Sequence, residues 1–181
     1  MWIRKIFSTA CVIFIVVGMI ACSNNENVTQ NKDVNRRNLE EDLLYANKRA
    51  VASELNRIAD YVKRYSYDMT VSGTGLHYQV TKDIDGELGM PGQIIEMEYI
   101  LQFLWGDTAY MSKTSGPLIF EIGHGNVESG LEELALLVSS GDHVKAIIPS
   151  YLGYGLLGDG NKIPAKASLV YDIQIVSIEN K

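Results

Sequence analysis

The sequence predicts an α+β fold, in which an antiparallel sheet of five to six strands wraps on one short helix and a longer N-terminal helix precedes the sheet. Two observations support this prediction. From residue 72 onward, short runs of alternating apolar and polar residues are separated by Gly, Pro and Asp. Only one stretch among them, 127–139, has helical spacing, which leaves little room for the helical crossovers of a parallel sheet.

The length of 181 residues allows one domain with a real core, which we place at 72–181, plus an extension. The net charge is −6, and no stretch of the chain concentrates basic residues. Phosphate backbones bind to basic surfaces, so this balance argues against a nucleic-acid partner.

Residues 1–21 have the pattern of a targeting segment rather than of folded structure. Arg4 and Lys5 precede an apolar run that ends at Ala21, and the run is short for a membrane-spanning helix. The order Met19-Ile20-Ala21-Cys22 resembles the lipobox of bacterial lipoproteins, which implies a lipid on Cys22. The alternative is an ordinary secretory signal that is cut near Ala21.

Cysteine usage agrees with a lipid anchor. Cys11 would leave with the signal segment and Cys22 would carry the lipid, so no disulfide is expected. Without Arg4 and Lys5, 14 of the 16 basic residues remain against 22 acidic ones, a net charge of −8. Anionic lipid headgroups would not attract such a surface, so attachment to a membrane would depend on the acyl chains.

Residues 22–36 are polar and predict a flexible tether. An N-terminal helix is expected within 37–68, with Asn38 as its cap. Its apolar stripe consists of Leu39, Leu43, Ala46, Ala50, Leu55, Ile58, Val62 and Tyr65. The stripe could dock a partner or a second copy, or it could pack on its own domain. We favour packing, because the alanines make the stripe modest.

The strands are expected where the alternation is clearest, at 76–82, 94–104, 108–113, 118–122, 143–148 and 168–178. In the second of these, Tyr99 shares the apolar face. Each run is bounded by turn residues, as a chain of antiparallel strands requires.

The segment 149–164 is a loop by its prolines and glycines, yet it carries large side chains. We expect Tyr154 and Ile163 to wall a binding cleft. Gly153, Gly155 and Gly158 match the spacing of a dinucleotide fingerprint. That fingerprint requires a helix immediately after it, and the sequence that follows cannot continue as a helix, so nucleotide binding is rejected.

Metal and hydrolytic sites are not expected either. His77, His124 and His143 are scattered, with no Cys or second His at ligand spacing. No Ser stands in a nucleophile elbow. The sequence therefore implies no metal and no cofactor.

Three ordered motifs carry a family resemblance. They are the stretch 120–131 (F-E-I-G-H-G-N-V-E-S-G-L), the stretch 148–155 (I-P-S-Y-L-G-Y-G) and the stretch 163–173 (I-P-A-K-A-S-L-V-Y-D-I). Residues 92–179 resemble the FKBP-type peptidyl-prolyl cis-trans isomerase domain. With the lipid anchor and the helical extension, the chain is most similar to the FKBP-like lipoproteins of Bacteroidota, including those associated with gliding motility.

The resemblance implies a fold and a set of site residues. The catalytic residues would be Tyr99, Tyr110, Tyr154 and Tyr171. The substrate-binding residues would be Leu118, Phe120, Val127, Glu128, Leu131 and Ile163. In the family, the hydroxyl at the place of Tyr154 and the main-chain N–H at the place of Glu128 bind ligand carbonyls. The sequence departs from the family at Leu131, Met111 and Glu128, where Trp, Asp and an aliphatic residue are common.

These observations lead to an expected function. The protein would be a lipid-anchored isomerase and folding helper, acting on proline-containing polypeptides in a bacterial cell envelope, at the outer membrane. Two alternatives stay open. The aromatic side chains could simply fill a closed core, or the domain could be a non-catalytic binding module in an envelope or gliding- or secretion-associated complex, with the 38–65 helix as its contact surface.

Overall fold

The computed structural model of the protein describes residues 26–181. The chain divides into two compact units, Met1–Ala50 and Val51–Lys181, and the helix α2 (Glu26–Tyr65) contributes residues to both. The targeting segment, Cys22 and the first part of the expected tether lie outside the described residues. Across 26–181, no helix has the length and apolar character needed to cross a membrane.

Helix α2 begins at Glu26, earlier than the expected start at Asn38. Residues 26–36, which composition assigns to the tether, therefore belong to the helix. They contain no Pro or Gly, and the Glu, Gln, Lys and Arg among them are good helix formers. Once the later turns are nucleated, adding such residues costs little, so a polar composition alone does not end a helix.

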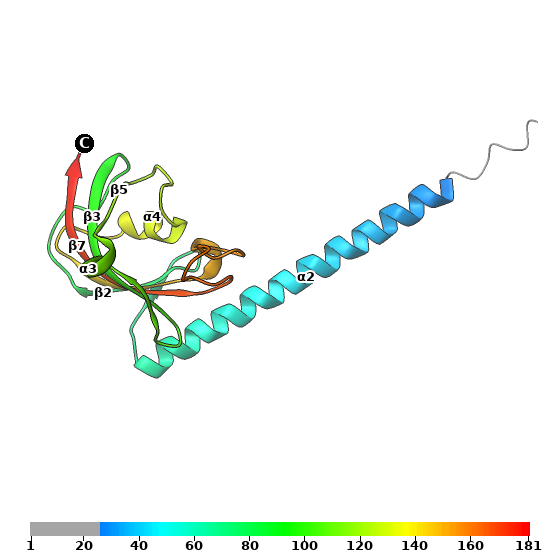
Figure 1. The fold of residues 1–181 in the computed structure, drawn as a ribbon, viewed down its shortest axis with the longest axis horizontal. Helices are drawn as coiled ribbons and strands as arrows, with labels where there is room; N and C mark the ends of the chain where they lie inside the picture. Colours follow the sequence, from blue (N-terminus) through cyan, green and yellow to red (C-terminus); the bar gives the residue numbers. More distant parts are fainter. Residues whose placement is uncertain (1–25) are drawn as a thin grey trace, which may run out of the picture. The chain divides into compact units, whose positions relative to one another are not determined.

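The second unit contains a seven-stranded sheet in the order β1-β2-β6-β7-β3-β4, with β5 paired to β3 (Figure 1). Every pairing is antiparallel, which confirms the predicted fold class. The strands are β1 (Thr70–Val71), β2 (His77–Lys82), β3 (Gln93–Phe103), β4 (Thr108–Met111), β5 (Leu118–Glu121), β6 (His143–Ile148) and β7 (Leu169–Asn180). The additional strand is β1, whose two residues are too few to show alternation in the sequence.

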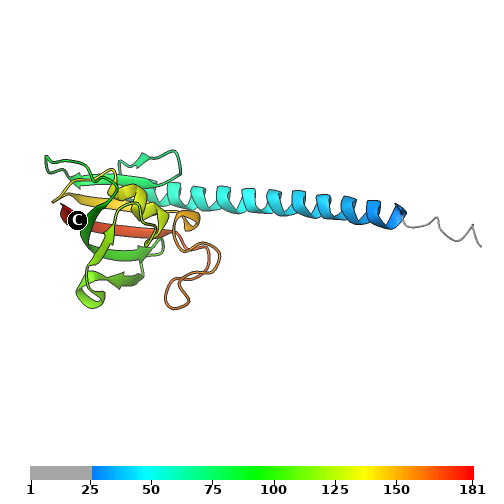
Figure 2. The same cartoon turned by 90° about the horizontal axis from the view of Figure 1, so that it is seen from above.

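Three short helical segments complete the unit: α3 (Ser112–Ser115), α4 (Ser129–Ala135) and the 3₁₀ turn η1 (Ser150–Leu152). The curved strands wrap around α4, as Figures 1 and 2 show. Leu131 and Leu134 of α4 are fully buried against the main core, together with Ile95 and Met97 of β3 and Leu169 and Ile173 of β7. The alternation of apolar and polar residues predicts one apolar face of the sheet. In the structure, that face packs against α4.

The other face of the sheet carries a second, smaller core. Val170 alternates with Leu169 and Tyr171 along β7, so its side chain points away from α4. Val170 and its partner Ile147 on β6 pack against Ile58 of α2. Ile58 is fully buried and contributes about 2 kcal/mol by leaving water.

The predicted stripe of α2 is therefore only partly used for packing. Ile58 is buried and Leu55 and Val62 are half-buried, whereas Leu39 and Leu43 are exposed. Tyr65, also on the predicted stripe, is exposed, and its neighbour Tyr61 is buried in its place. The helical spacing of apolar residues predicted the helix, but it did not predict which of its turns pack against the domain.

A buried carboxylate also joins α2 to the domain. Glu54 is only 4% exposed, and it accepts hydrogen bonds from the Ser150 N–H at 2.6 Å and the Ser150 hydroxyl at 2.9 Å. The Ser168 hydroxyl donates a third, at 2.7 Å. A buried charge needs such partners, because burial removes its hydration. The three donors make Glu54 part of the domain structure rather than a surface charge of the helix.

Candidate active site: an aromatic cluster around Glu128

Strand β3 brings three of the predicted tyrosines together. Its Leu101 pairs with Tyr110 on β4 and with Tyr171 on β7, so the two tyrosines flank β3. Tyr99, also on β3, lies with its ring centroid 6.1 Å from that of Tyr171, in a tilted arrangement. Tyr154 comes from the loop after η1 and is half-buried against the same core.

Glu128 lies among these tyrosines. It is the residue before the first turn of α4, and the Tyr171 hydroxyl donates a hydrogen bond to its carboxylate at 3.0 Å. Burial and then the negative charge of Glu128 raise the pKa of Tyr171 well above its ordinary value. Burial and then the Glu128 carboxylate likewise raise the pKa of Tyr154. Both hydroxyls are thus hydrogen-bond donors held beside a carboxylate.

Tyr110 has an acidic partner of its own, Asp159 in the loop. The Tyr110 hydroxyl donates a hydrogen bond to one Asp159 oxygen. This hydrogen bond is the main cause that raises the pKa of Tyr110, and burial is the second. The other Asp159 oxygen accepts the N–H groups of Asn161 at 2.8 Å and Ile163 at 2.7 Å. Burial works against ionisation of Asp159, but these hydrogen bonds outweigh it and leave its pKa lowered. Asp159 thus fixes the loop to β4.

Sequence reasoning did not include Asp159, Asn161 or Lys162 in the site. Lys162 lies with its ammonium 4.8 Å above the centre of the Tyr110 ring and donates to the Ala109 carbonyl at 3.0 Å. A signal was available for Asp159: an Asp between glycines, followed two residues later by Asn, is typical of a turn in which the side chain accepts backbone N–H groups.

The remaining predicted residues surround the tyrosines at different depths. Phe120, Leu131 and Ile163 are buried in the main core, and Leu131 is fully buried. Leu118 and Val127 are half-buried and pack against that core. The structure therefore gathers the predicted set around one core, in which Tyr99, Tyr110, Tyr154 and Glu128 are half-buried and Tyr171 and Leu131 are buried.

Two cavities in the described part of the chain are lined mostly by residues outside the predicted site. One, of about 250 Å³, includes Tyr99 and Met111. The rest of its lining comes from β3, β6, β7 and α3 and is polar except for Ile100 and Ile173. The other, of about 460 Å³, lies beside α2 and shares no residue with the predicted site. Of the four tyrosines, only Tyr99 lines either of these two cavities.

Two of the three histidines make local contacts in the structure. His77 Nδ1 lies 3.0 Å from the Gly75 carbonyl oxygen, and His124 Nε2 lies 2.9 Å from the Glu121 carboxylate. Within residues 26–181, no group of three or more His, Cys, Asp or Glu side chains has the arrangement of a metal site.

Comparison with known proteins identifies related chains. The family described as "FKBP-type peptidyl-prolyl cis-trans isomerase" matches residues 86–176. The FK506-binding protein 2 of Dictyostelium discoideum is 36% identical over 88 residues, which are 48% of this chain and 66% of that protein. A probable FKBP-type peptidyl-prolyl cis-trans isomerase, FkpA, of Neisseria meningitidis serogroup B is 32% identical over 108 residues, 59% of this chain and 39% of that protein. The matches thus span only part of each relative.

Solved structures show the same fold. The crystal structure of FkpA from Escherichia coli superposes with a TM-score of 0.62 at 22% identity, covering 97% of this chain and 82% of that one. The crystal structure of AtFKBP13 superposes with a TM-score of 0.56 at 29% identity, covering 61% of this chain and 98% of that one.

Proposed function

Because the chain belongs to the FKBP-type peptidyl-prolyl cis-trans isomerase family, we propose that it accelerates the cis-trans exchange of X-Pro bonds in polypeptides. The observation that carries this proposal is the gathering of Tyr99, Tyr110, Tyr154 and Tyr171 around the start of α4, where the family places its substrate. No acid, base or metal step is needed. The barrier, about 20 kcal/mol, comes from amide resonance, which apolar surroundings weaken by stripping water from the planar amide.

In this proposal, the Tyr154 hydroxyl donates to the carbonyl of the bound X-Pro segment. A tyrosine hydroxyl is protonated at neutral pH, and burial and Glu128 raise the pKa of Tyr154 further. The Glu128 carboxylate lies close to Tyr154. It therefore competes with a substrate carbonyl for the hydrogen bond that the Tyr154 hydroxyl donates. Leu156 and Leu157 follow Tyr154 in the loop and are 69% and 89% exposed, so they are available to contact a client chain.

The test is an exchange assay on a short X-Pro peptide. Tyr154→Phe should lower kcat/KM about tenfold, the value of one hydrogen bond of about 1.4 kcal/mol made in the transition state. Tyr151→Phe is the matched control, because its hydroxyl donates to the Thr74 carbonyl outside the cluster. It should leave the rate within about twofold. Exchange by the parent protein no faster than the blank would refute the proposed activity.

We also propose that the protein is attached to the outer membrane of a bacterium through a lipid on Cys22 and that it acts on envelope polypeptides. The support is the apolar segment before Cys22 and the resemblance of the order Met19-Ile20-Ala21-Cys22 to a lipobox. Incorporation of a labelled fatty acid by the parent, and its loss in Cys22→Ser, checks the attachment. Labelling that persists in Cys22→Ser would contradict it.

The second candidate function is a non-catalytic binding module in an envelope or gliding- or secretion-associated complex. The exposed apolar side chains of α2 favour it, since Leu39, Leu43, Leu44 and Tyr45 are each more than half exposed. Such a face suits a partner helix or a second copy. An exchange rate equal to the blank, together with an association that Leu43→Glu abolishes, would favour this function over catalysis.

A further inference from the structure

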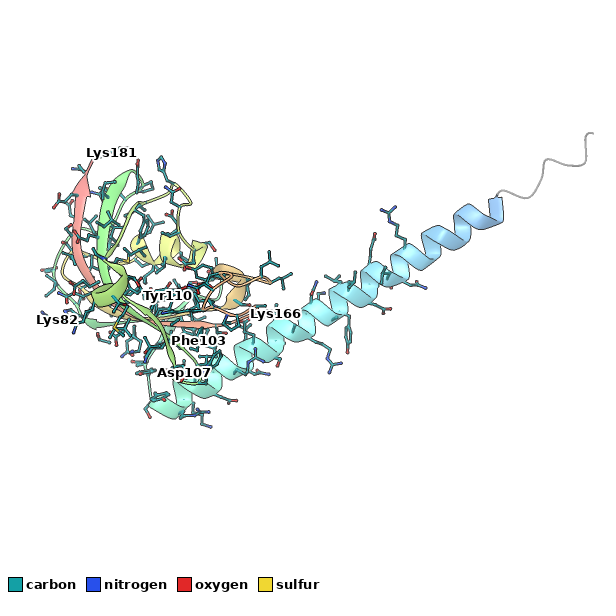
Figure 3. All side chains as sticks on the ribbon, viewed as in Figure 1. Lys82, Phe103, Asp107, Tyr110, Lys166 and Lys181 are labelled. Carbon is teal, nitrogen blue, oxygen red and sulfur yellow. The ribbon has the colours of Figure 1, made fainter. Side chains whose placement is uncertain are left out.

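The cavity of about 460 Å³ lies on the face of the sheet opposite α4. Its lining comes from three separate places: the last turns of α2, the turn between β3 and β4, and the segment just before β7. The lining residues are Arg57, Asp60, Tyr61, Arg64, Leu104, Trp105, Lys166, Ala167 and Ser168. Of the residues near it, Phe103, Asp107 and Lys166 are labelled in Figure 3. We refer to this cavity as the basic pocket.

The charge of the basic pocket is opposite to that of the whole chain. Arg57, Arg64 and Lys166 line it against the single acid Asp60, whereas the chain has a net charge of −6. Among residues 26–181, none of these three cations has a carboxylate oxygen within 4.0 Å. Neighbouring cations repel one another, so an anionic group that enters the pocket gains Coulomb energy from all of them.

The aromatic side of the pocket is held in place. The Trp105 ring is 60% exposed, yet it stacks on Phe103 with 4.4 Å between centroids, and its N–H donates to Asp107 at 2.9 Å. Because the ring is fixed before a ligand arrives, covering it costs little conformational entropy. Trp, Tyr and Arg are also the residues that dominate measured binding energies at protein interfaces, and all three types line this pocket.

We propose that the basic pocket binds an acidic polypeptide segment, with carboxylates on Arg57, Arg64 and Lys166 and an apolar side chain on Trp105. Arg57, Arg64 and Lys166 would attract an anionic ligand whether or not the domain is an isomerase. The choice of a polypeptide as the ligand does rest on the proposed function, whose substrates are polypeptides. The pocket would then hold part of a client at a face of the sheet that the tyrosine cluster does not share.

Trp105 provides a direct reporter. The sequence contains two tryptophans, so the Trp2→Phe variant of the full chain leaves Trp105 as the only one. The probe is a blocked hexapeptide, Glu-Leu-Asp-Glu-Leu-Glu, and its control is Gln-Leu-Asn-Gln-Leu-Gln. Neither contains proline. The acidic peptide should change the Trp105 emission in a saturable way that weakens with salt, and the amide peptide should not.

Charge removal then locates the binding. Arg57→Gln with Arg64→Gln should weaken acidic-peptide binding at least tenfold, with the parent's thermal unfolding temperature retained because Arg57 and Arg64 are both exposed. Lys82→Gln with Lys181→Gln removes two cations far from the pocket (Figure 3) and should leave the affinity unchanged. Equal affinity in the Arg57 and Arg64 variant would overturn the proposal. So would an equal response to the amide peptide, or a response to anionic phospholipid vesicles alone.

Prolyl exchange by the same variants separates the two proposals. Arg57 and Arg64 are not part of the tyrosine cluster, so exchange of a short uncharged X-Pro peptide should keep the parent's rate. Loss of acidic-peptide binding with full exchange supports the basic pocket as an independent site. Absence of peptide binding in a protein that is fully active overturns the pocket and leaves the isomerase proposal standing.

Discussion

Replacing Glu54 with Ala is expected to lower the free energy of unfolding by about 3 kcal/mol. The substitution leaves the Ser150 N–H, the Ser150 hydroxyl and the Ser168 hydroxyl without their acceptor, and both serines are buried. Unsatisfied buried donors cost more than the hydrogen bonds were worth in stability, because their desolvation is no longer compensated. Urea denaturation of the full chain measures the change.

Two further variants make this result specific. Glu54→Gln keeps the shape and one acceptor oxygen, so it should lose roughly half as much stability. Glu41→Ala removes an exposed acid from the same helix and should change stability by less than about 0.5 kcal/mol. If Glu54→Ala were no more destabilising than Glu41→Ala, the carboxylate would not hold α2 to the sheet.

Gly158→Ala is expected to abolish most of the prolyl exchange activity and to destabilise the domain by more than about 2 kcal/mol. A Cβ at this position would lie 2.0 Å from the Ile163 carbonyl oxygen and 2.9 Å from the Pro164 carbonyl carbon. Both are backbone atoms, so the collision cannot be relieved by a change of rotamer. The loop must open there, and its opening moves Ile163 and Asp159, whose N–H donates to that carbonyl at 3.1 Å.

Gly155→Ala is the matched control in the same loop. Gly155 has a φ of +62° and Gly158 a φ of +70°, so each alanine pays a similar cost of about 1 kcal/mol for the left-handed conformation. At Gly155, however, a Cβ meets nothing within 4 Å. The difference between the two variants, in thermal unfolding and in exchange rate, therefore isolates the close backbone approach. Equal effects would show that backbone conformation alone makes these glycines necessary.

The sheet was predictable because alternation is a local signal. Ile95, Met97 and Leu101 recur every second or fourth residue, and each is buried on the face toward α4. The extent of α2 was less predictable, because its first turns carry no apolar stripe to mark them. The burial of Glu54 could not be read from sequence at all. Its partners Ser150 and Ser168 are about a hundred residues away, and the spacing of charged residues on a helix does not reveal distant donors.

The sequence predicted which residues of the proposed site would lie near one another, but not which of them would form hydrogen bonds. The tyrosines were identified through the family resemblance. The structure places Tyr99, Tyr110 and Tyr171 together because β3 pairs with both β4 and β7, whereas Tyr154 comes from the loop after η1. The hydrogen bond from Tyr171 to Glu128 depends on how α4 lies against β7, which no motif specifies. Asp159 was missed for a different reason: the loop was interpreted by its glycines and large side chains, and its one acid was not considered.

The hydrogen bonds of Glu54 have a consequence for the dynamics of the loop that carries Tyr154. Ser150 and Ser168 lie at the two ends of this loop, so the hydrogen bonds to the single Glu54 carboxylate hold the two ends together. Holding both ends at one point removes much of the freedom of the intervening chain before any substrate arrives. The end of α2 and this loop should then open as one cooperative unit. In Glu54→Ala, amide hydrogen exchange should show that the backbone N–H groups of α2 and of the loop lose protection together.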